Sequence, residues 1–144
     1  MAFELGKLIA QESWVLLSGG RNAGVMDSVN KGAKAAGGLT VGIMPTKDER
    51  MISDAVDIPI ITDMGSARNS INVLSCAVVI ACGVGGAGTA SEVALALKAK
   101  KRVILLRDTK ESQMFFRKIG GNLLHTVETP EHAIALVKEL LKQQ

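Results

Sequence analysis

Residues 77–106 read AVVIACGVGGAGTASEVALALKAKKRVILL, and this stretch predicts the fold. An apolar run at 77–82 is followed by a glycine-rich turn, by apolar residues at helical spacing over 89–99, and by a second apolar run at 102–106. Strands that are apolar throughout are typical of parallel sheets, because crossover helices bury both of their faces. The order therefore predicts a strand, a helix and a second strand of one parallel sheet.

The same two kinds of segment recur along the chain. They are strands expected at 14–17 and 39–44, and helices expected at 1–12, 24–36, 66–75 and 130–142. Residues 44–61 form the least regular connection, with two prolines and a charged segment. The sequence therefore predicts one doubly wound, Rossmann-like α/β domain over residues 1–144, a parallel sheet flanked by helices.

The composition narrows the class of protein. Of 144 residues, 47% are hydrophobic and 15 are glycine, which excludes disorder and a coiled coil and predicts an aliphatic core. Aromatic residues make up 3%, too few for a surface on which bases of single-stranded nucleic acid stack. The net charge of +3 comes from scattered lysines and arginines, which slightly favours small anionic ligands and predicts no nucleic-acid partner.

Other features predict a reduced protein without a metal site. Cys76 and Cys82 lie in apolar surroundings without the spacing of a zinc site or a redox pair, and the two histidines are isolated. The chain opens without a signal-peptide pattern. The uncharged stretch 69–91 is interrupted by polar residues and glycines, as in a buried strand rather than a membrane span. We therefore expect a cytoplasmic protein without a membrane contact.

The first candidate ligand site is the turn SGGRNAG at residues 18–24, since ligands of open parallel sheets bind at the carboxyl ends of strands. Gly19, Gly20 and Gly24 let backbone N–H groups approach an anion at a helix N-terminus, with Arg21 as a counter-charge. Glycines also occur in ordinary tight turns, so both interpretations stay open.

The second candidate is the densest glycine cluster, residues 83–88, ahead of a helix expected to begin at Thr89, a capping residue type. Small residues at such a turn predict a phosphate site. The spacing also matches GxGxxG, with Asp108 where a dinucleotide-binding domain has its ribose-binding acid; this hypothesis is the weaker one, because the unit lies late in the chain. Glu92, one turn into the helix, is either stabilised by the helix dipole or functional.

The third candidate is MGSARN at residues 64–69, which places Arg68 in the first turn of the helix expected at 66–75. The helix dipole makes that end positive, so an arginine is unfavourable there unless an anion binds. An exposed or salt-bridged arginine is the alternative.

The chain resembles the molybdenum cofactor carrier proteins in three stretches, SGGRNAGVMDSVNKGAKAAGG (18–38), SDAVDIPIITDMGSARNSINVLS (53–75) and GVGGAGTASEVALALKAKKRVILL (83–106). Their superfamily, often labelled lysine decarboxylase-like, also contains the Lonely Guy phosphoribohydrolases. The resemblance implies a Rossmann-like fold and a homo-oligomer, a dimer or a tetramer. It also implies a binding protein that stores and protects the molybdenum cofactor and transfers it to molybdoenzymes without turnover.

Together with the three turns, the resemblance assigns the residues that hold the pterin and phosphate of the cofactor. They are Gly19, Gly20, Arg21, Gly24, Ser66, Arg68, Asn69, Gly85, Gly86, Gly88, Thr89 and Glu92.

An enzyme is the alternative. In the related phosphoribohydrolases the motif GGxGTxxE and an upstream arginine hold a nucleoside 5'-monophosphate and assist cleavage of its N-glycosidic bond. Glu92 and Arg68 match the two catalytic positions. The chain departs from the enzymes at Val84, where they have proline, and at Asn69, where they have lysine. We therefore expect a carrier rather than an enzyme.

The family begins with another strand and a glycine-containing loop, ahead of the helix that here starts at Met1. In a 3-2-1-4-5 sheet that strand is the central one. We expect either a fragment or mis-started product, or a gap filled by rearranged pairing or by a partner's strand. Because an open gap leaves backbone groups unpaired, the expected state is an oligomer or a molten monomer.

Overall fold

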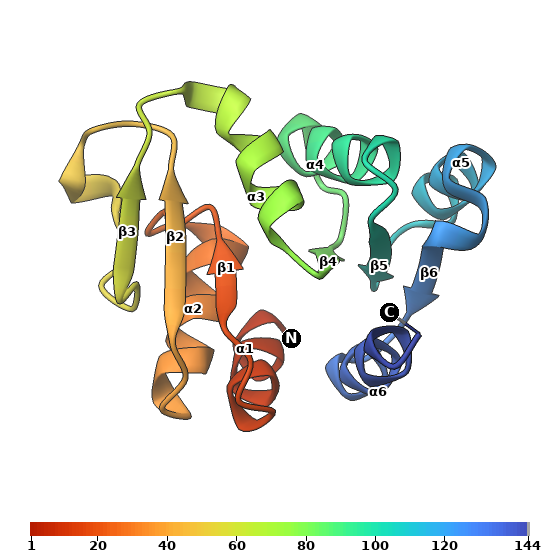
Figure 1. Cartoon of the computed structure of the whole chain (residues 1–144), viewed down its shortest axis with the longest axis horizontal. Coiled ribbons are helices and arrows are strands. Elements are labelled where there is room, and N and C mark those ends of the chain that lie inside the picture. Colours follow the sequence, from red (N-terminus) through yellow and green to blue (C-terminus); the bar gives the residue numbers. More distant parts are fainter. Residues whose placement is uncertain (144) are drawn as a thin grey trace. The chain divides into compact units, whose positions relative to one another are not determined.

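The structure divides into two compact units, each a small parallel α/β arrangement. The computed structural model describes residues 1–143, and the units are Met1–Asn72 and Val73–Gln144. The predicted α/β, Rossmann-like fold class is confirmed, because the described strands pair in parallel and helices flank them (Figure 1). That residues 1–144 form one domain stays a prediction.

The first unit contains a parallel sheet in the order β1-β2-β3. Its elements are α1 (Ala2–Gln11), β1 (Leu16–Ser18), α2 (Gly24–Ala35), β2 (Thr40–Met44), the 3-10 turns η1 (Glu49–Met51) and η2 (Gly65–Arg68), β3 (Ile58–Ile61) and the start of α3 (Asn69–Ser75). In the register of the sheet, Gly42 of β2 lies opposite Ser18 of β1 and Pro59 of β3. Both α1 and α2 lie against one face of this sheet (Figure 1).

Two glycines set how closely α1 and α2 pack. A Cβ atom on Gly6 would lie 1.9 Å from the carbonyl oxygen of Val29, and one on Gly32 would lie 1.8 Å from that of Phe3. These distances are far below van der Waals contact, so only glycine lets the two backbones approach this closely. The helix pair therefore depends on residues that ordinary helix propensity disfavours.

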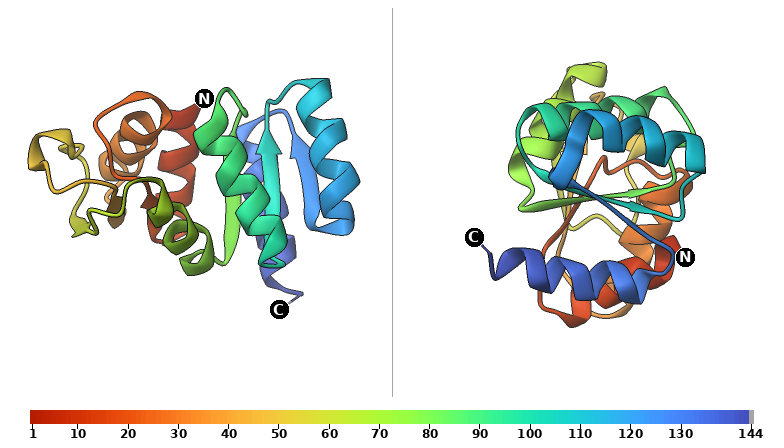
Figure 2. Two further views of the ribbon diagram at one scale, coloured as in Figure 1. Left: turned by 90° about the horizontal axis from the view of Figure 1, so that it is seen from above. Right: turned by 90° about the vertical axis from the view of Figure 1, so that its right-hand side faces the viewer.

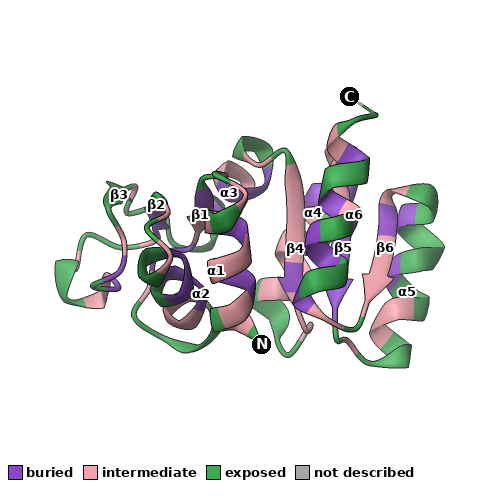
Figure 3. Ribbon diagram, turned by 90° about the horizontal axis from the view of Figure 1, so that it is seen from below, coloured by how far each residue is buried: buried purple, intermediate pink, exposed green. Residues whose placement is uncertain are grey.

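The second unit contains a parallel sheet in the order β4-β5-β6. Its elements are β4 (Val78–Cys82), α4 (Ala87–Lys98), β5 (Arg102–Leu106), α5 (Lys110–Gly120), the 3-10 turn η3 (Gly121–Leu123), β6 (Leu124–Val127) and α6 (Pro130–Leu141). Helices α4 and α5 cover one face of the sheet and α6 covers the other (Figure 2). Four consecutive residues of β5, 103–106, are fully buried, and Figure 3 shows this strand as the centre of the core. The predicted aliphatic core is confirmed, with Phe116 as its one aromatic member among the described residues.

The predicted burial of all four apolar runs holds for β2 and β5 but is wrong for β1 and β4, which are largely half-buried. Each of these is an edge strand: within residues 1–143, β1 pairs only with β2, and β4 only with β5. An edge strand has a neighbour on one side alone, so less of its surface is covered.

Several boundaries also differ from the predictions. The irregular connection 44–61 contains strand β3, and the chain after Leu106 contains α5 and β6, none of which was predicted. The helix expected at 66–75 is divided into η2 and α3. Helix α4 begins two residues before Thr89, with Gly86 in the capping position. Within the described part of the chain, no helix is both long and apolar enough to cross a membrane.

The close packing of α1 and α2 predicts that Gly32→Ala destabilises the fold. Helix propensity alone would make alanine the better residue by about 1 kcal/mol. The clash with the carbonyl oxygen of Phe3 forces the helices apart, and we expect a net loss of about 1–3 kcal/mol in the free energy of unfolding. Urea denaturation measures this difference, and unchanged or increased stability would contradict the close contact.

Gly88→Ala is the matched control. Gly88 is also helical, but nothing lies within 4 Å of a Cβ atom built there. We expect its free energy of unfolding to equal that of the parent protein or to exceed it by up to about 1 kcal/mol, the difference in helix propensity.

Candidate functional site

The turn after β1 is shaped by glycines that have no room for a side chain. Gly20 has φ +71°, and a Cβ atom on it would lie 2.6 Å from the sulfur of Met44. A Cβ atom on Gly19 would lie 2.6 Å from Nη2 of Arg68. Gly20 therefore lets the turn pack against β2, and Gly19 leaves the space that the Arg68 guanidinium occupies.

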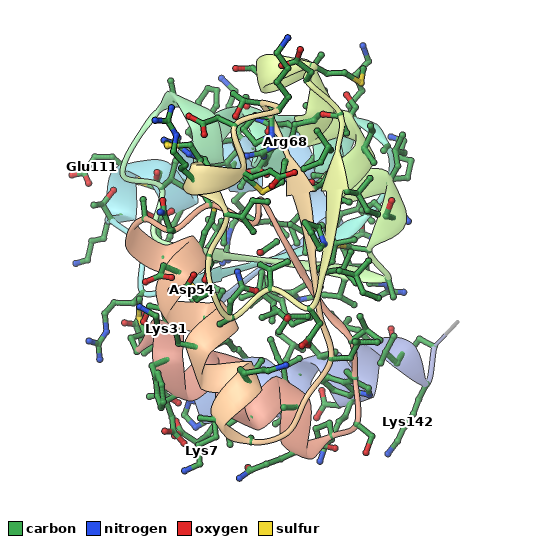
Figure 4. The ribbon with its side chains drawn as sticks, turned by 90° about the vertical axis from the view of Figure 1, so that its left-hand side faces the viewer. Lys7, Lys31, Asp54, Arg68, Glu111 and Lys142 are labelled. Carbon is green, nitrogen blue, oxygen red and sulfur yellow. The ribbon has the colours of Figure 1, made fainter. Side chains whose placement is uncertain are left out.

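Arg68 is a buried charge beside this turn. Only 7% of its surface is exposed, and its Nη1 donates a 2.7 Å hydrogen bond to Oδ1 of Asn69. Figure 4 shows Arg68 inside the ribbon, whereas Lys7 and Lys31 extend outward. The exposed-arginine interpretation is wrong. Arg68 is the last residue of the 3-10 turn η2, which runs directly into α3, so it lies in the first turn of this helical stretch, as predicted.

A buried polar pair fixes the start of the turn. Asn30 of α2 is fully buried, and its Nδ2 donates a 3.0 Å hydrogen bond to Oγ of Ser18. The same oxygen accepts a 3.1 Å hydrogen bond from the backbone N–H of Gly20. Ser18 thus ties the end of β1, the turn and α2 together.

The segment around η1 closes over the other side of the turn. The backbone N–H of Ser53 donates to the carbonyl of Gly20 at 2.9 Å, and that of Asn22 donates to the carbonyl of Met51 at 2.9 Å. The Ser53 hydroxyl donates a 2.7 Å hydrogen bond to Oδ1 of Asp27 on α2. Ser18 belongs to the turn predicted from the sequence, but the roles of Asn30, Asp27 and Ser53 were not predicted, because short polar residues far apart in sequence carry no local signal of their pairing.

The other predicted site residues of the first unit are Arg21, Gly24 and Ser66. Arg21 is half-buried and forms a backbone bridge with Ile52. Gly24 has φ +57° at the start of α2, and Ser66 is exposed on η2. The first unit thus brings Gly19 and Gly20 together with Arg68 and Asn69.

The glycine cluster of the second unit is open. Gly85, Gly86 and Gly88 are exposed, and a Cβ atom at any of them would meet nothing within 4 Å. Thr89 and Glu92 follow on α4 and are half-buried. These glycines are not required by packing, so the space beside them is available to a ligand.

Asp108 holds this turn in place. Its Oδ1 accepts hydrogen bonds from the backbone N–H groups of Val84 at 3.1 Å and Thr109 at 2.8 Å. Its Oδ2 is buried and has no hydrogen-bond partner within residues 1–143. The residue that the dinucleotide hypothesis assigned to a ribose thus supports the loop between β4 and α4.

The helices that begin at the two glycine turns differ from α5 and α6 at their N-termini. Thr109 and Thr129 cap α5 and α6 by accepting 3.3 Å hydrogen bonds from backbone N–H groups of the first turn. For α2 and α4, whose capping residues are Ala23 and Gly86, no side chain among the described residues serves as a cap. Their first-turn N–H groups lack helical acceptors, and such groups bind anions well.

The cysteines do not take part in this chemistry. Cys76 and Cys82 are free and half-buried, and burial raises the pKa of both thiols, that of Cys82 to about 11. At neutral pH both stay protonated and are poor metal ligands. No cluster of His, Cys, Asp and Glu suited to a metal ion occurs in the part of the chain that the structure describes.

Most of the chain matches known proteins. A family model described as the SLOG cluster4 family matches residues 1–134. The molybdenum cofactor binding protein of Rippkaea orientalis is 55% identical, with a TM-score of 0.93 over 97% of this chain and 85% of that chain. The molybdenum cofactor carrier protein of Chlamydomonas reinhardtii is 55% identical, with a TM-score of 0.92 over 99% of this chain and 87% of that chain.

Two further relatives match in sequence. An uncharacterized protein of Archaeoglobus fulgidus is 45% identical over 134 residues, which cover 93% of this chain and 81% of the relative. A cytokinin riboside 5'-monophosphate phosphoribohydrolase of Mycobacterium tuberculosis is 31% identical over 96 residues, which cover 65% of this chain and 50% of that enzyme.

The Asp27 contacts predict a pH-dependent loosening of the first turn. Hydrogen bonds from Lys31 and Ser53 hold the pKa of Asp27 below its ordinary value of 3.8. A lowered pKa in the folded state means that the stabilisation is present above the ordinary value and is lost as pH falls through the lowered one. We therefore expect the amides of Asn22 and Ser53 to keep their hydrogen-exchange protection down to about pH 4 and to lose it progressively at lower pH, after correction for intrinsic rates.

Asp27→Asn provides the comparison. We expect its protection at these two amides to be reduced already at pH 6 and to change little on acidification. The same pH dependence in parent and variant would show that another group controls the segment.

Proposed function

The chain belongs to the SLOG cluster4 family, and we propose that within it this protein is a molybdenum cofactor carrier. The observation that carries this proposal is the match, over nearly the whole chain, to two structures described as molybdenum cofactor binding and carrier proteins. The resemblance stated from the sequence motifs is thereby confirmed. The cofactor is the cargo, which the protein binds, protects and passes on.

The geometry of each unit suits an anionic cargo. In the first unit, the Arg68 guanidinium lies buried against a glycine turn at the uncapped start of α2. In the second unit, exposed glycines surround the uncapped start of α4. A phosphate gains strong hydrogen bonds from both kinds of donor, because backbone N–H groups and a guanidinium are complementary to its oxygens. We assign the phosphate and pterin to these donors.

Asn69 supports a carrier over an enzyme. Its Oδ1 accepts the hydrogen bond from Arg68, whereas the lysine typical of the enzymes carries only donors and a positive charge. The asparagine therefore fixes the guanidinium in one orientation, which suits steady holding of a ligand. We also propose molybdoenzymes as recipients, the cytoplasm as location, and a homo-oligomer as the assembled form.

Arg68→Met tests the assignment of the binding charge. Methionine keeps an unbranched side chain in the buried site and removes the guanidinium. We expect the dissociation constant for the cofactor, measured anaerobically by retention on gel filtration, to rise about tenfold or more, as for loss of a charged hydrogen bond.

Lys47→Met is the control, since it removes the same charge from an exposed position in the same unit. Its affinity should equal that of the parent protein, and thermal unfolding should show both variants folded. Equal affinity in Arg68→Met and the control would remove Arg68 from the site.

The second candidate function is a nucleoside 5'-monophosphate phosphoribohydrolase, which the Mycobacterium tuberculosis relative favours. It assigns catalysis to Glu92 and Arg68. Under the carrier proposal, incubation with AMP yields no adenine, and Glu92→Gln leaves this result unchanged. Adenine release by the parent protein that disappears in Glu92→Gln would assign the chain to the enzymes.

A further inference from the structure

A methionine sulfur lies beside the buried arginine of the first unit. Met26 is in the first turn of α2, and its Sδ lies 2.6 Å from the point that a Cβ atom on Gly19 would occupy. Nη2 of Arg68 lies 2.6 Å from the same point. The sulfur and Nη2 therefore cannot be farther apart than twice this distance, and the two side chains share the space that Gly19 leaves open.

Met26 differs in exposure from the other methionine at this turn. Met44, whose Sδ lies 2.6 Å from the Cβ position of Gly20, is fully buried, whereas Met26 is half-buried. Oxidation of a methionine converts its apolar thioether into a polar sulfoxide, and it depends on access of the oxidant to the sulfur. We therefore expect a small oxidant to reach Met26 and to leave Met44 unchanged.

The Arg68 guanidinium offers an oxidised Met26 a hydrogen-bond partner. An arginine side chain carries five N–H donors and no acceptor, and the oxygen of a sulfoxide is an acceptor. Nη1 of Arg68 donates to Oδ1 of Asn69, and Nη2 is the atom that lies beside Gly19 together with the sulfur of Met26. An oxygen atom added to this sulfur therefore lies next to a donor of the proposed binding charge.

From this geometry we propose that Met26 is a modification site, oxidised by hydrogen peroxide to methionine sulfoxide, and that the sulfoxide weakens binding of an anionic ligand at Arg68. In this reaction the O–O bond of peroxide breaks and an S–O bond forms. The sulfur gives up two electrons, and the remainder of the peroxide leaves as water. The new oxygen accepts a guanidinium hydrogen bond that the phosphate of the ligand then lacks. This inference rests on the proposed function, in which Arg68 holds the phosphate.

Oxidation of the empty protein before loading tests the proposal. The parent protein is treated with hydrogen peroxide, the peroxide is removed, and peptide mass spectrometry locates the sulfoxides. We expect sulfoxide at Met26. The dissociation constant for the molybdenum cofactor, measured anaerobically by retention on gel filtration, should rise about tenfold, as for loss of one charged hydrogen bond. Thermal unfolding should show the treated protein folded.

Met26→Leu separates this sulfur from the other methionines. Leucine is apolar and similar in size, and it has no sulfur to oxidise. The treated variant should keep its own untreated affinity, although peroxide still oxidises exposed methionines such as Met114, which is 73% exposed. Met114→Leu is the matched control, because it removes a sulfur far more exposed than that of Met26. Its affinity should fall about tenfold on treatment, like that of the parent.

Arg68→Met shows whether the sulfoxide acts through the guanidinium. Because this variant lacks the donor, peroxide treatment should lower its residual affinity little further. Absence of sulfoxide at Met26, an unchanged dissociation constant after its oxidation, an equal loss in treated Met26→Leu, or a further tenfold loss in treated Arg68→Met would each overturn the inference. A parent protein that does not bind the cofactor before treatment overturns the proposed function, and this inference with it.

Discussion

The structure depends on places where the backbone is approached more closely than a Cβ atom permits. Gly6 and Gly32 bring α1 and α2 into direct backbone contact, and α2 in turn packs on β1 and β2. At Gly19 the approaching groups are the ends of two side chains, and the Arg68 guanidinium occupies part of the space of a missing side chain. Glycine raises the entropy of the unfolded chain, which opposes folding. In this unit the close contacts offset that entropy loss, and the absence of a side chain at glycine positions allows both the close helix packing and the position of the Arg68 guanidinium.

Strands whose residues are buried and apolar throughout could be predicted from the sequence, whereas exposed strands and strands of mixed composition could not. The runs that became β2 and β5 are buried and apolar throughout, so they are easy to recognise. Strand β3 is exposed along its whole length and contains Pro59, and β6 mixes His125 and Thr126 with apolar residues. The start of α4 was misplaced because Gly86, in an extended conformation, takes the capping position that residue type had suggested for Thr89.

The candidate site also has a part that the sequence predicts and a part that it does not. The glycine turns and the arginine can be recognised in the sequence, because glycine allows unusual backbone conformations and arginine carries a charge. The supporting hydrogen bonds are not visible, since Asn30 reaches Ser18 across 12 positions and Ser53 reaches Asp27 across 26. Only the folded chain brings these short polar side chains together. The motifs thus predict the residues proposed to contact the ligand, whereas the structure shows the hydrogen bonds that hold these motifs in place.

If the cargo binds as proposed at the uncapped starts of α2 and α4, its binding is coupled to folding. A helix without a capping side chain forgoes the hydrogen bond that Thr109 and Thr129 supply to their own helices. An anion bound at such an end takes over that role, and a ligand that binds only the folded state raises its stability by mass action. Under the proposed binding mode, the filled form would open less readily than the empty form and would therefore resist proteases for longer.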